Sequence, residues 1–454
     1  MYNFLTNSLS NFYISKKNNT LVIFITLLIF LYFYKLYNGY ILFYPDTERY
    51  LQGINLKFSH HSNLAIGIIF IPLFKMFGFV GWYYTQLLIS AYVLSIFKTR
   101  VLPRIPISLF LLSLFVSMYG FVVLTLIVDF FSYLSILCLI LIYKNKDDFL
   151  SNLILLLSIA AHTGNLILIF FLSISLGLIY KKKKKTLFIL SFIIFSIFIN
   201  GIYAYLTINK LYFSIPVKYT ILSARIISNG PYLIEEYSNK YPNSFISKHK
   251  NQFLKNTILN SPESVLWGIN SPIYKKHSEF ENEAKHFVIF TLKNNLIQNI
   301  YFCLYNSYRQ FLILPAPVKI YDEWNRDWYL NYIKTYNKSD LKDFNNSLFI
   351  KDMLKEKTLP LSYLCRLINF FSLILSIYIL IIHKNRKNHL TYVLSLLSVL
   401  TILITIITMP NLSSTADRYL LRIIPISILS FCVNIYYLFK VAQNHNILKS
   451  QLKI

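Results

Sequence analysis

The 454-residue chain is 55% hydrophobic, 17% aromatic and only 14% charged, with a formal net charge of +26. A soluble protein of this composition would lack the polar surface that water requires, so the sequence predicts a polytopic membrane protein. The basic residues form short clusters between apolar runs, which is typical of membrane topology signals and not of a nucleic-acid-binding domain. No nucleic-acid partner is expected, and four scattered cysteines exclude a disulfide framework.

Apolar runs long enough to cross a membrane, about 17 to 20 residues or more, occur along most of the chain. The clear runs are 21–43, 80–97, 105–120, 121–143, 187–206, 361–382, 390–408 and 419–439. Two regions are ambiguous. Residues 63–77 are short for a span, and residues 150–180 are interrupted in the middle by the polar sequence at 162–165.

The positive-inside rule selects one topology. Short basic clusters occur at residues 16–17, 98–104, 144–146, 181–185 and 384–387. All five lie on one side only if 63–77 does not cross and 150–180 crosses twice. The expected fold is therefore all-α, with about ten transmembrane helices and both termini cytoplasmic.

On this topology the outer face collects the polar loops. We expect an N-terminal transmembrane module at 1–207 with an outer loop at 44–62, an extracytoplasmic region at 208–357, and a three-helix transmembrane module at 358–454. Within the extracytoplasmic region, an amphipathic stretch around residues 286–312 is placed to lie along the membrane surface.

Three acidic residues near the outer face are candidates for chemistry. Asp46 begins a predicted helix, where it serves as a helix N-cap, as an acceptor of a proton from a substrate hydroxyl, or as both. Glu48 is either its partner carboxylate or a first-turn charge. Asp129 lies within an apolar run, where an acid is costly and usually faces a cavity or a cationic partner.

Histidine and asparagine side chains supply further candidates on the same face. His61 is interpreted as a phosphate contact, a metal ligand or part of a solvated loop, since nothing in its spacing is diagnostic of a metal site. His162 and Asn165 either contact a phosphate or hydroxyl group at the membrane edge or form a simple interhelical turn.

Two arginines begin the last apolar run. Arg418 and Arg422 are four residues apart and so share a helix face. Because Arg422 lies inside the apolar span, it needs a partner, and pairing with Asp129 or Asp417 competes with binding of an anionic ligand.

These motifs carry a resemblance to a known class of enzymes. "PDTERYL" at 45–51 resembles the first-loop acidic motif of integral-membrane glycosyltransferases with the GT-C fold. Asp129 is similar to an acidic position early in a middle span of that class. The break at 162–165 resembles its "R/H-x-x-N" element, and "DRYLLRIIPI" at 417–426 resembles its closing helix, although Arg422 stands where those enzymes usually keep apolar residues. The stretch beginning "ARIISNGPYLIEEY" resembles outer loops of uncharacterised bacterial membrane proteins, which implies that Arg225 lies in a shared loop.

The resemblance implies transfer of a sugar from a polyprenyl-phosphate carrier to a glycan or lipid acceptor, at the outer leaflet of a bacterial inner membrane. Asp46 and Asp129 would be catalytic, with Asp46 as the base. Glu48, His61, His162, Asn165, Arg225, Arg418 and Arg422 would bind substrate. No organic cofactor is implied, and a divalent metal is left open. The alternatives are a component of a lipid-linked oligosaccharide transporter or polymerase, and a non-catalytic scaffold for envelope assembly.

Overall fold

The structure is a computed structural model that describes most of the chain. The described residues are 16–43, 47, 50–51, 64–208, 218–257, 265–266, 271–275, 277–313, 329–331, 333–335, 340–351, 353–383, 389–412 and 417–451. Within these ranges the secondary structure is helical apart from one isolated β-bridge, between Leu42 and Thr125.

Among the described helices, six are long and apolar enough to cross a membrane. They are Asn19–Asn38, Ala65–Arg100, Lys183–Leu206, Met353–Ile382, Leu390–Asn411 and Ile424–Gln443. The chain is therefore an all-α polytopic membrane protein, as its composition predicts. Shorter apolar helices occur at Ile107–Val116, Phe130–Tyr143, Phe149–Ala161 and Gly164–Tyr180. Since the expected ten spans include several of these, that number stays a prediction.

The chain divides into two compact units. Unit 1 comprises Met1–Leu211, Ala316–Leu400 and Leu421–Ile454, and unit 2 comprises Tyr212–Pro315 and Thr401–Leu420. Unit 1 thus combines the N-terminal part with the C-terminal part of the chain. The three modules expected from the sequence have different boundaries and stay a prediction about topology.

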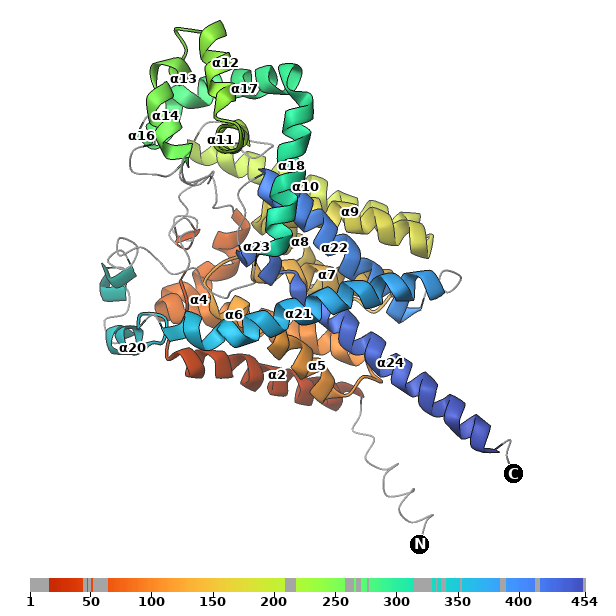
Figure 1. The fold of residues 1–454 in the computed structure, drawn as a ribbon. Coiled ribbons are helices and arrows are strands. Elements are labelled where there is room, and N and C mark those ends of the chain that lie inside the picture. The colour runs from red at the N-terminus through yellow and green to blue at the C-terminus, as the bar shows by residue number, and fades with distance from the viewer. Residues whose placement is uncertain are drawn as a thin grey trace. The chain divides into compact units, whose positions relative to one another are not determined.

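Unit 1 is a bundle built around α7 (Figure 1). Every residue of α7 is buried, and its neighbours are α4, α8, α9 and α24. The helices of this unit are α2 (Lys16–Asn38), α4 (Leu64–Arg100), α5 (Ile107–Val116), α6 (Tyr119–Leu124), α7 (Phe130–Tyr143), α8 (Phe149–Ala161), α9 (Thr163–Tyr180), α10 (Lys183–Ile208), α20 (Leu341–Asn346), α21 (Met353–Ile382) and α24 (Ile424–Gln451). Helices α22 (Leu390–Leu412) and α23 (Asp417–Leu421) each cross the boundary between the units.

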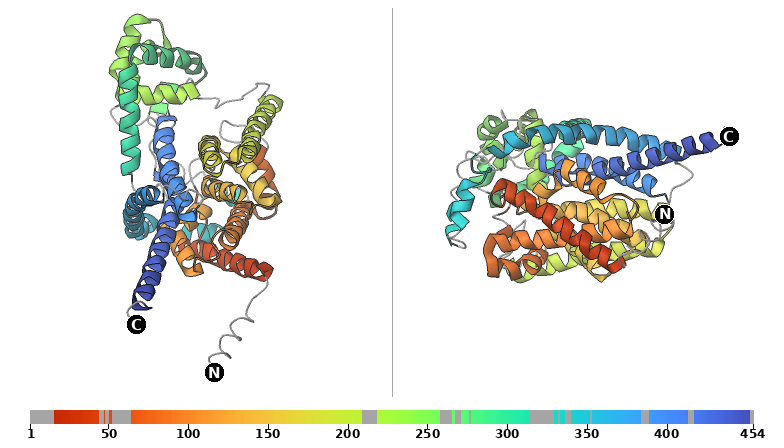
Figure 2. Two further views of the ribbon diagram at one scale, coloured as in Figure 1. Left: turned by 90° about the vertical axis from the view of Figure 1, so that its right-hand side faces the viewer. Right: turned by 90° about the horizontal axis from the view of Figure 1, so that it is seen from below.

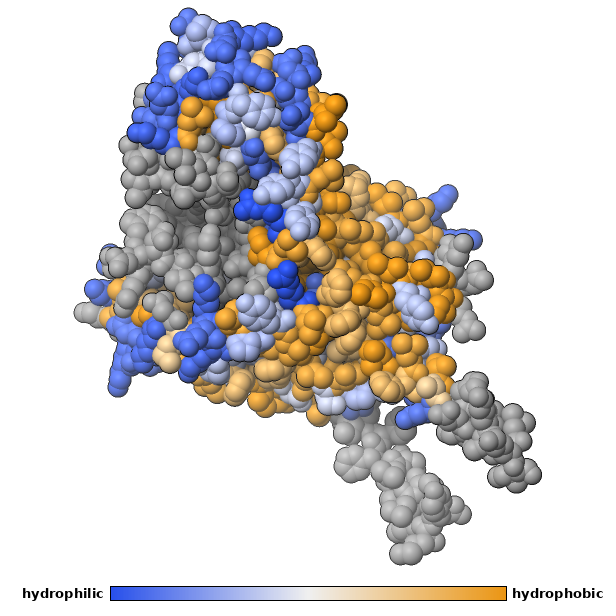
Figure 3. Space-filling model, in the orientation of Figure 1, coloured by the Kyte–Doolittle hydropathy of each residue, from blue (hydrophilic) through white to orange (hydrophobic). Residues whose placement is uncertain are grey.

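Two long helices flank this bundle. Helix α2 packs along α4, and α21 packs along α24; both pairs can be followed in the further views of Figure 2. Apolar side chains cover the surface over α21 and α24, whereas polar side chains gather near α20 (Figure 3). A wide apolar surface is what a bundle surrounded by lipid requires.

Helix α4 folds back on itself at Gly78. This residue has φ 58° and ψ −139°, a conformation that an L side chain rarely adopts. A Cβ atom added to Gly81 would lie 1.9 Å from the carbonyl oxygen of Leu73, although eight residues of straight helix would separate the two by about 12 Å. The stretch expected at 63–77 is therefore distinct from the span expected at 80–97.

The run expected as one helix over 121–143 is divided. Helix α6 ends at Leu124, α7 begins at Phe130, and the backbone between them is not helical. Non-helical backbone at membrane depth must find hydrogen-bond partners in the protein. Leu42 supplies two of these partners, since its N–H donates to Leu124 O at 3.1 Å and its carbonyl accepts from Leu126 N at 2.9 Å. Gln86 Nε2 donates to the carbonyls of Val123 and Thr125 at 2.7 and 2.8 Å.

Unit 2 contains α11 (Lys218–Asn229), α12 (Tyr232–Lys240), α13 (Phe245–Lys248), α14 (Lys250–Thr257), α16 (Pro272–Lys275), α17 (His277–Asn294) and α18 (Leu296–Leu312). Helix α11 packs on α17, and an apolar core that includes Ile227, Tyr237, Phe253 and Phe287 holds the helices together.

Helix α18 covers the second half of the amphipathic stretch expected at 286–312 and is largely polar on its inner side. Its buried residues include Asn299, Asn306 and Gln310. Its exposed residues include Leu296, Ile297, Ile300, Tyr301, Leu304, Tyr305, Tyr308 and Leu312. This distribution is the reverse of that in a helix on the surface of a water-soluble protein.

The fold-back of α4 depends on the missing side chain at residue 81. We expect Gly81→Ala to lower the free energy of unfolding by about 1–3 kcal/mol, because the added methyl group meets backbone that has no room to move. Thermal unfolding of the purified protein in detergent measures this. Leu88→Ala, at a side chain that is 45% exposed in the same helix, should change stability by less than about 0.5 kcal/mol. Equal melting temperatures for Gly81→Ala and the wild type would contradict the fold-back.

The two ends of α9 test the orientation in the membrane. Its 18 residues span about 27 Å, enough to place Thr163 and Lys183 near opposite surfaces. In a background without native cysteines, Thr163→Cys should react with an impermeant thiol reagent in intact cells. Lys183→Cys should react only after permeabilisation. The reverse labelling pattern would overturn the predicted sidedness.

Candidate functional site

A buried ion pair lies at the break before α7. Arg422 Nη1 donates to Asp129 Oδ1 at 2.8 Å, and each side chain is only 3% exposed. Asp129 is the residue immediately before α7, and Arg422 lies between α23 and α24. Of the roles that the sequence left open for Arg422, the structure therefore shows the pairing with Asp129.

His162 borders the same carboxylate. Its Nε2 atom lies 3.8 Å from Asp129 Oδ1, and its side chain is 23% exposed. The residue forms the junction of α8 and α9, where its Nδ1 atom accepts a hydrogen bond from Gly164 N at 3.0 Å. This junction confirms the break expected at 162–165. Since His162 is more exposed than the ion pair, it is the polar residue of this cluster most open to a ligand.

Asn165 fixes the junction to the central helix. Its Oδ1 atom accepts from the Ser132 hydroxyl at 2.6 Å, and its Nδ2 atom donates to Ser158 O at 3.1 Å. Asn165 and Ser132 are both fully buried. Asn165 is thus part of the scaffold that holds His162 near Asp129.

The first-loop motif also reaches this region. The hydroxyl of Thr47, within "PDTERYL", donates to Leu126 O at 2.9 Å and is buried. Leu126 belongs to the non-helical stretch that leads to Asp129. The motif is therefore anchored three residues before the buried acid in the sequence. We call Asp129, His162, Asn165 and Arg422 the buried polar cluster.

Several predicted site residues are not placed by the structure. Asp46, Glu48 and His61 lie outside the described residues. Arg418 belongs to α23, but its side chain also lies outside what the structure describes. Their predicted roles stay predictions.

Arg225 is in unit 2, apart from the buried polar cluster of unit 1. Its guanidinium is buried, with Nη1 2.9 Å from Asn411 Oδ1 and 3.1 Å from Cys303 Sγ. Asn411 also donates to Ser307 Oγ at 3.2 Å. These contacts join α11, α18 and the end of α22 within unit 2, which is a structural role that the sequence did not suggest.

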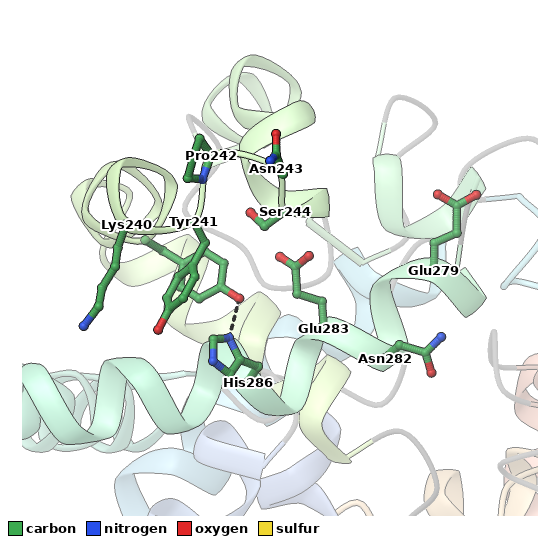
Figure 4. Close-up of a pocket in the computed structure, with 10 residues that line it drawn as sticks. Lys240, Tyr241, Pro242, Asn243, Ser244, Glu279, Asn282, Glu283 and His286 are labelled. Atoms are coloured by element: carbon green, nitrogen blue, oxygen red, sulfur yellow. Dashed lines mark hydrogen bonds between the residues drawn. The ribbon is translucent and has the colours of Figure 1, made fainter.

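A polar pocket of about 630 Å³ opens in unit 2 (Figure 4). A hydrogen bond of 2.8 Å joins the Tyr237 hydroxyl and His286 Nδ1 at its base, and the ring of Tyr241 packs edge-on against His286. Burial, followed by the charge of Glu283, raises the pKa of Tyr237, so its hydroxyl stays protonated at neutral pH.

Glu283 points toward the start of α13 in this pocket (Figure 4). Its carboxylate accepts hydrogen bonds from Phe245 N and, at 3.1 Å, from Ile246 N. Asn243, Glu279 and Asn282 line the rest of the rim. No sequence motif predicts this pocket, because its residues come from α12, α17 and the turn between α12 and α13.

Among the residues that the structure describes, no three His, Cys, Asp or Glu side chains are grouped closely enough to hold a metal ion. Within the described residues, the buried polar cluster contains two such side chains, Asp129 and His162, and the Asp129 carboxylate is paired with Arg422.

No protein-family model matches the sequence, and comparisons with curated proteins and with solved structures find no match either. The functional assignment consequently depends on the residues of the chain itself.

The ion pair predicts a specific pattern of stability. Asp129→Asn and Arg422→Gln should each lower the free energy of unfolding by about 3–5 kcal/mol, because each leaves a buried charge without its partner. The double variant Asp129→Leu/Arg422→Met should lose much less than the sum.

Thermal unfolding in detergent measures these losses. Arg100→Gln is a matched control, because the Arg100–Asp148 pair at 3.0 Å is partly exposed and should contribute about 1 kcal/mol or less. Additive losses in the double variant would show that the two charges are not coupled.

Proposed function

We propose that the protein is a membrane glycosyltransferase that moves a sugar from a polyprenyl-phosphate carrier to a glycan or lipid acceptor of the cell envelope. We place the reaction at the outer leaflet of a bacterial inner membrane, with both termini in the cytoplasm. The observation that supports this most is the buried polar cluster. It combines a cation, an acid and a partly exposed histidine at two helix breaks in an apolar bundle.

The proposed roles follow from the chemistry of each group. The Arg422 guanidinium, held by Asp129, is a planar group whose paired N–H donors match the oxygens of a phosphate, so we propose that it binds the phosphate of the carrier. Asp129 is then a positioning residue that holds the guanidinium in place. His162 is the second phosphate contact. Stabilising the phosphate as it leaves with its negative charge lowers the barrier to transfer.

The base on the acceptor hydroxyl is Asp46 in this proposal. It precedes Thr47, which is anchored to the stretch that leads to Asp129, and this supports a role for the first-loop motif near the buried polar cluster. Glu48, His61 and Arg418 are proposed to bind substrate beside it. We also propose that the polar pocket of unit 2 binds a glycan, because its aromatic rings, amides and carboxylates offer the groups that hydroxyl-rich ligands need.

Two other functions make different demands on the same residues. A lipid-linked oligosaccharide transporter would move its carrier without breaking the sugar–phosphate bond, whereas a polymerase would break that bond in one carrier and join the released oligosaccharide to the glycan of another. An envelope-assembly scaffold would tolerate loss of the charged residues. Mass spectrometry of envelope glycans and lipid carriers, with and without the gene, separates these functions, because loss of the transferase leaves a carrier loaded with the untransferred sugar, whereas loss of a transporter or polymerase leaves carriers loaded with finished oligosaccharide.

The assignment of Asp46 is tested by Asp46→Asn. Asparagine keeps the ability to cap a helix but cannot accept a proton, so transfer should fall by at least about 100-fold at normal protein abundance. Asp343→Asn, the same change at an exposed acid of α20 outside the proposed site, is the matched control and should retain the wild-type activity. Near-normal transfer by Asp46→Asn, measured with purified protein in detergent, would return Asp46 to a capping role.

A further inference from the structure

An apolar groove lies between α2 and α4 in unit 1, and a lysine stands at one end of it. The groove has a volume of about 560 Å³. Its walls are Leu28, Ile29, Tyr32, Phe33 and Leu36 from α2, and Leu73, Phe77, Tyr84, Leu87 and Leu88 from α4. None of these residues was a candidate from the sequence.

The groove opens toward the surface of the unit. Ile29 is 68% exposed, Phe33 is 57% exposed and Phe77 is 47% exposed. The opposite side of α2 carries buried residues, including Leu31 and Tyr34, and the Tyr34 ring packs on Phe121. The groove is thus on the lipid side of α2, and the body of α2 separates it from α6 and the break before α7.

Lys35 places a positive charge at one end of this groove. It lies in the last turn of α2, and its ammonium group is 5.5 Å from the ring centroid of Tyr32 and 5.7 Å from that of Tyr84. Both rings belong to the groove wall. Among the described residues, no carboxylate lies within ion-pair distance of Lys35. Asp340 Oδ2 accepts a hydrogen bond from the Tyr40 hydroxyl at 2.9 Å.

A cation held by two aromatic rings at the end of a membrane helix is placed at the level of lipid headgroups. The apolar groove below it suits a hydrocarbon chain, because the two tyrosines are the only polar residues among the described ones that line it. A free phosphate ion would contact the lysine but would bury none of the apolar surface. The combination therefore selects a lipid whose headgroup is anionic.

We propose that this groove binds an anionic phospholipid, with one acyl chain between α2 and α4 and the phosphate at Lys35. The Tyr32 and Tyr84 hydroxyl groups are further donors for the phosphate oxygens. The site does not depend on the proposed transferase activity, since the groove shares no residue with the buried polar cluster.

Binding of defined lipids to delipidated, purified protein tests this site. Dioleoyl phosphatidylglycerol is the anionic probe, and dioleoyl phosphatidylcholine has the same chains with a zwitterionic headgroup. The measurements are the dissociation constant in detergent and lipid retention by native mass spectrometry. We expect the wild type to prefer phosphatidylglycerol and Lys35→Gln to weaken its binding about tenfold, the loss of one charge-assisted contact.

Three further variants separate charge, shape and fold. Lys35→Arg keeps the charge and should retain the binding of phosphatidylglycerol. Leu36→Trp should fill the groove and weaken both lipids. Leu112→Trp, on α5 and 50% exposed outside the groove, is the matched control and should bind as the wild type does.

The proposal is overturned if the wild type binds the two lipids equally, or if Lys35→Gln binds phosphatidylglycerol as well as the wild type does. Competition by inorganic phosphate at the concentration of the lipid would also overturn it, by showing that the acyl chain contributes nothing. Tighter binding of farnesyl phosphate than of phosphatidylglycerol would overturn the phospholipid assignment and would show that the groove binds an isoprenoid lipid instead. None of these results depends on glycosyl transfer. The transferase proposal is tested separately, by comparing transfer by the wild type with transfer by Asp46→Asn.

Discussion

The contact between Asp129 and Arg422 joins two parts of the chain that are 293 residues apart. Placing either charge alone in a bilayer costs about 2.5–3.5 kcal/mol at the centre of a helix on insertion scales. The pair removes much of this cost and fixes the start of α7, the fully buried helix around which unit 1 packs. The positions of the helix breaks on either side, and of His162 beside the carboxylate, follow from this constraint.

Weaker polar contacts also join helices elsewhere in the bundle. The Ser372 and Ser427 hydroxyls are 2.9 Å apart between α21 and α24, and Asn434 Nδ2 donates to Ser395 Oγ at 2.9 Å between α24 and α22. Lipid offers no hydrophobic drive for helices to associate, so small residues and interhelical hydrogen bonds supply much of the specificity. The C-terminal helices are therefore aligned by serine and asparagine, whereas the ion pair fixes them to the centre.

The sequence predicted the membrane class, the break at His162 and the need of Arg422 for a partner, because each depends on a local cost of burying polar groups. It left Asp129 and Asp417 as equal partners, since a contact between distant segments has no local signature. The fold-back at Gly78 was only implied by the topology, because an apolar run with several glycines does not show which one adopts a positive φ. The break after Leu124 was missed for a similar reason: its hydrogen-bond partners, Leu42 and Gln86, lie far away in the sequence.

The exposed face of α18 is apolar and its buried face is largely polar, so the average hydropathy of the helix does not show which of its faces favours lipid. Averaged over its length, this helix is too polar to be counted as a membrane segment, and only its individual faces show where it belongs. Ile297 is 81% exposed while Gln310 is fully buried. Excised from the chain, residues 212–315 would carry this apolar stripe into aqueous buffer, where it favours self-association. Unit 2 thus combines a polar average composition with an apolar helix face, and detergent would cover that face as it covers the spanning helices.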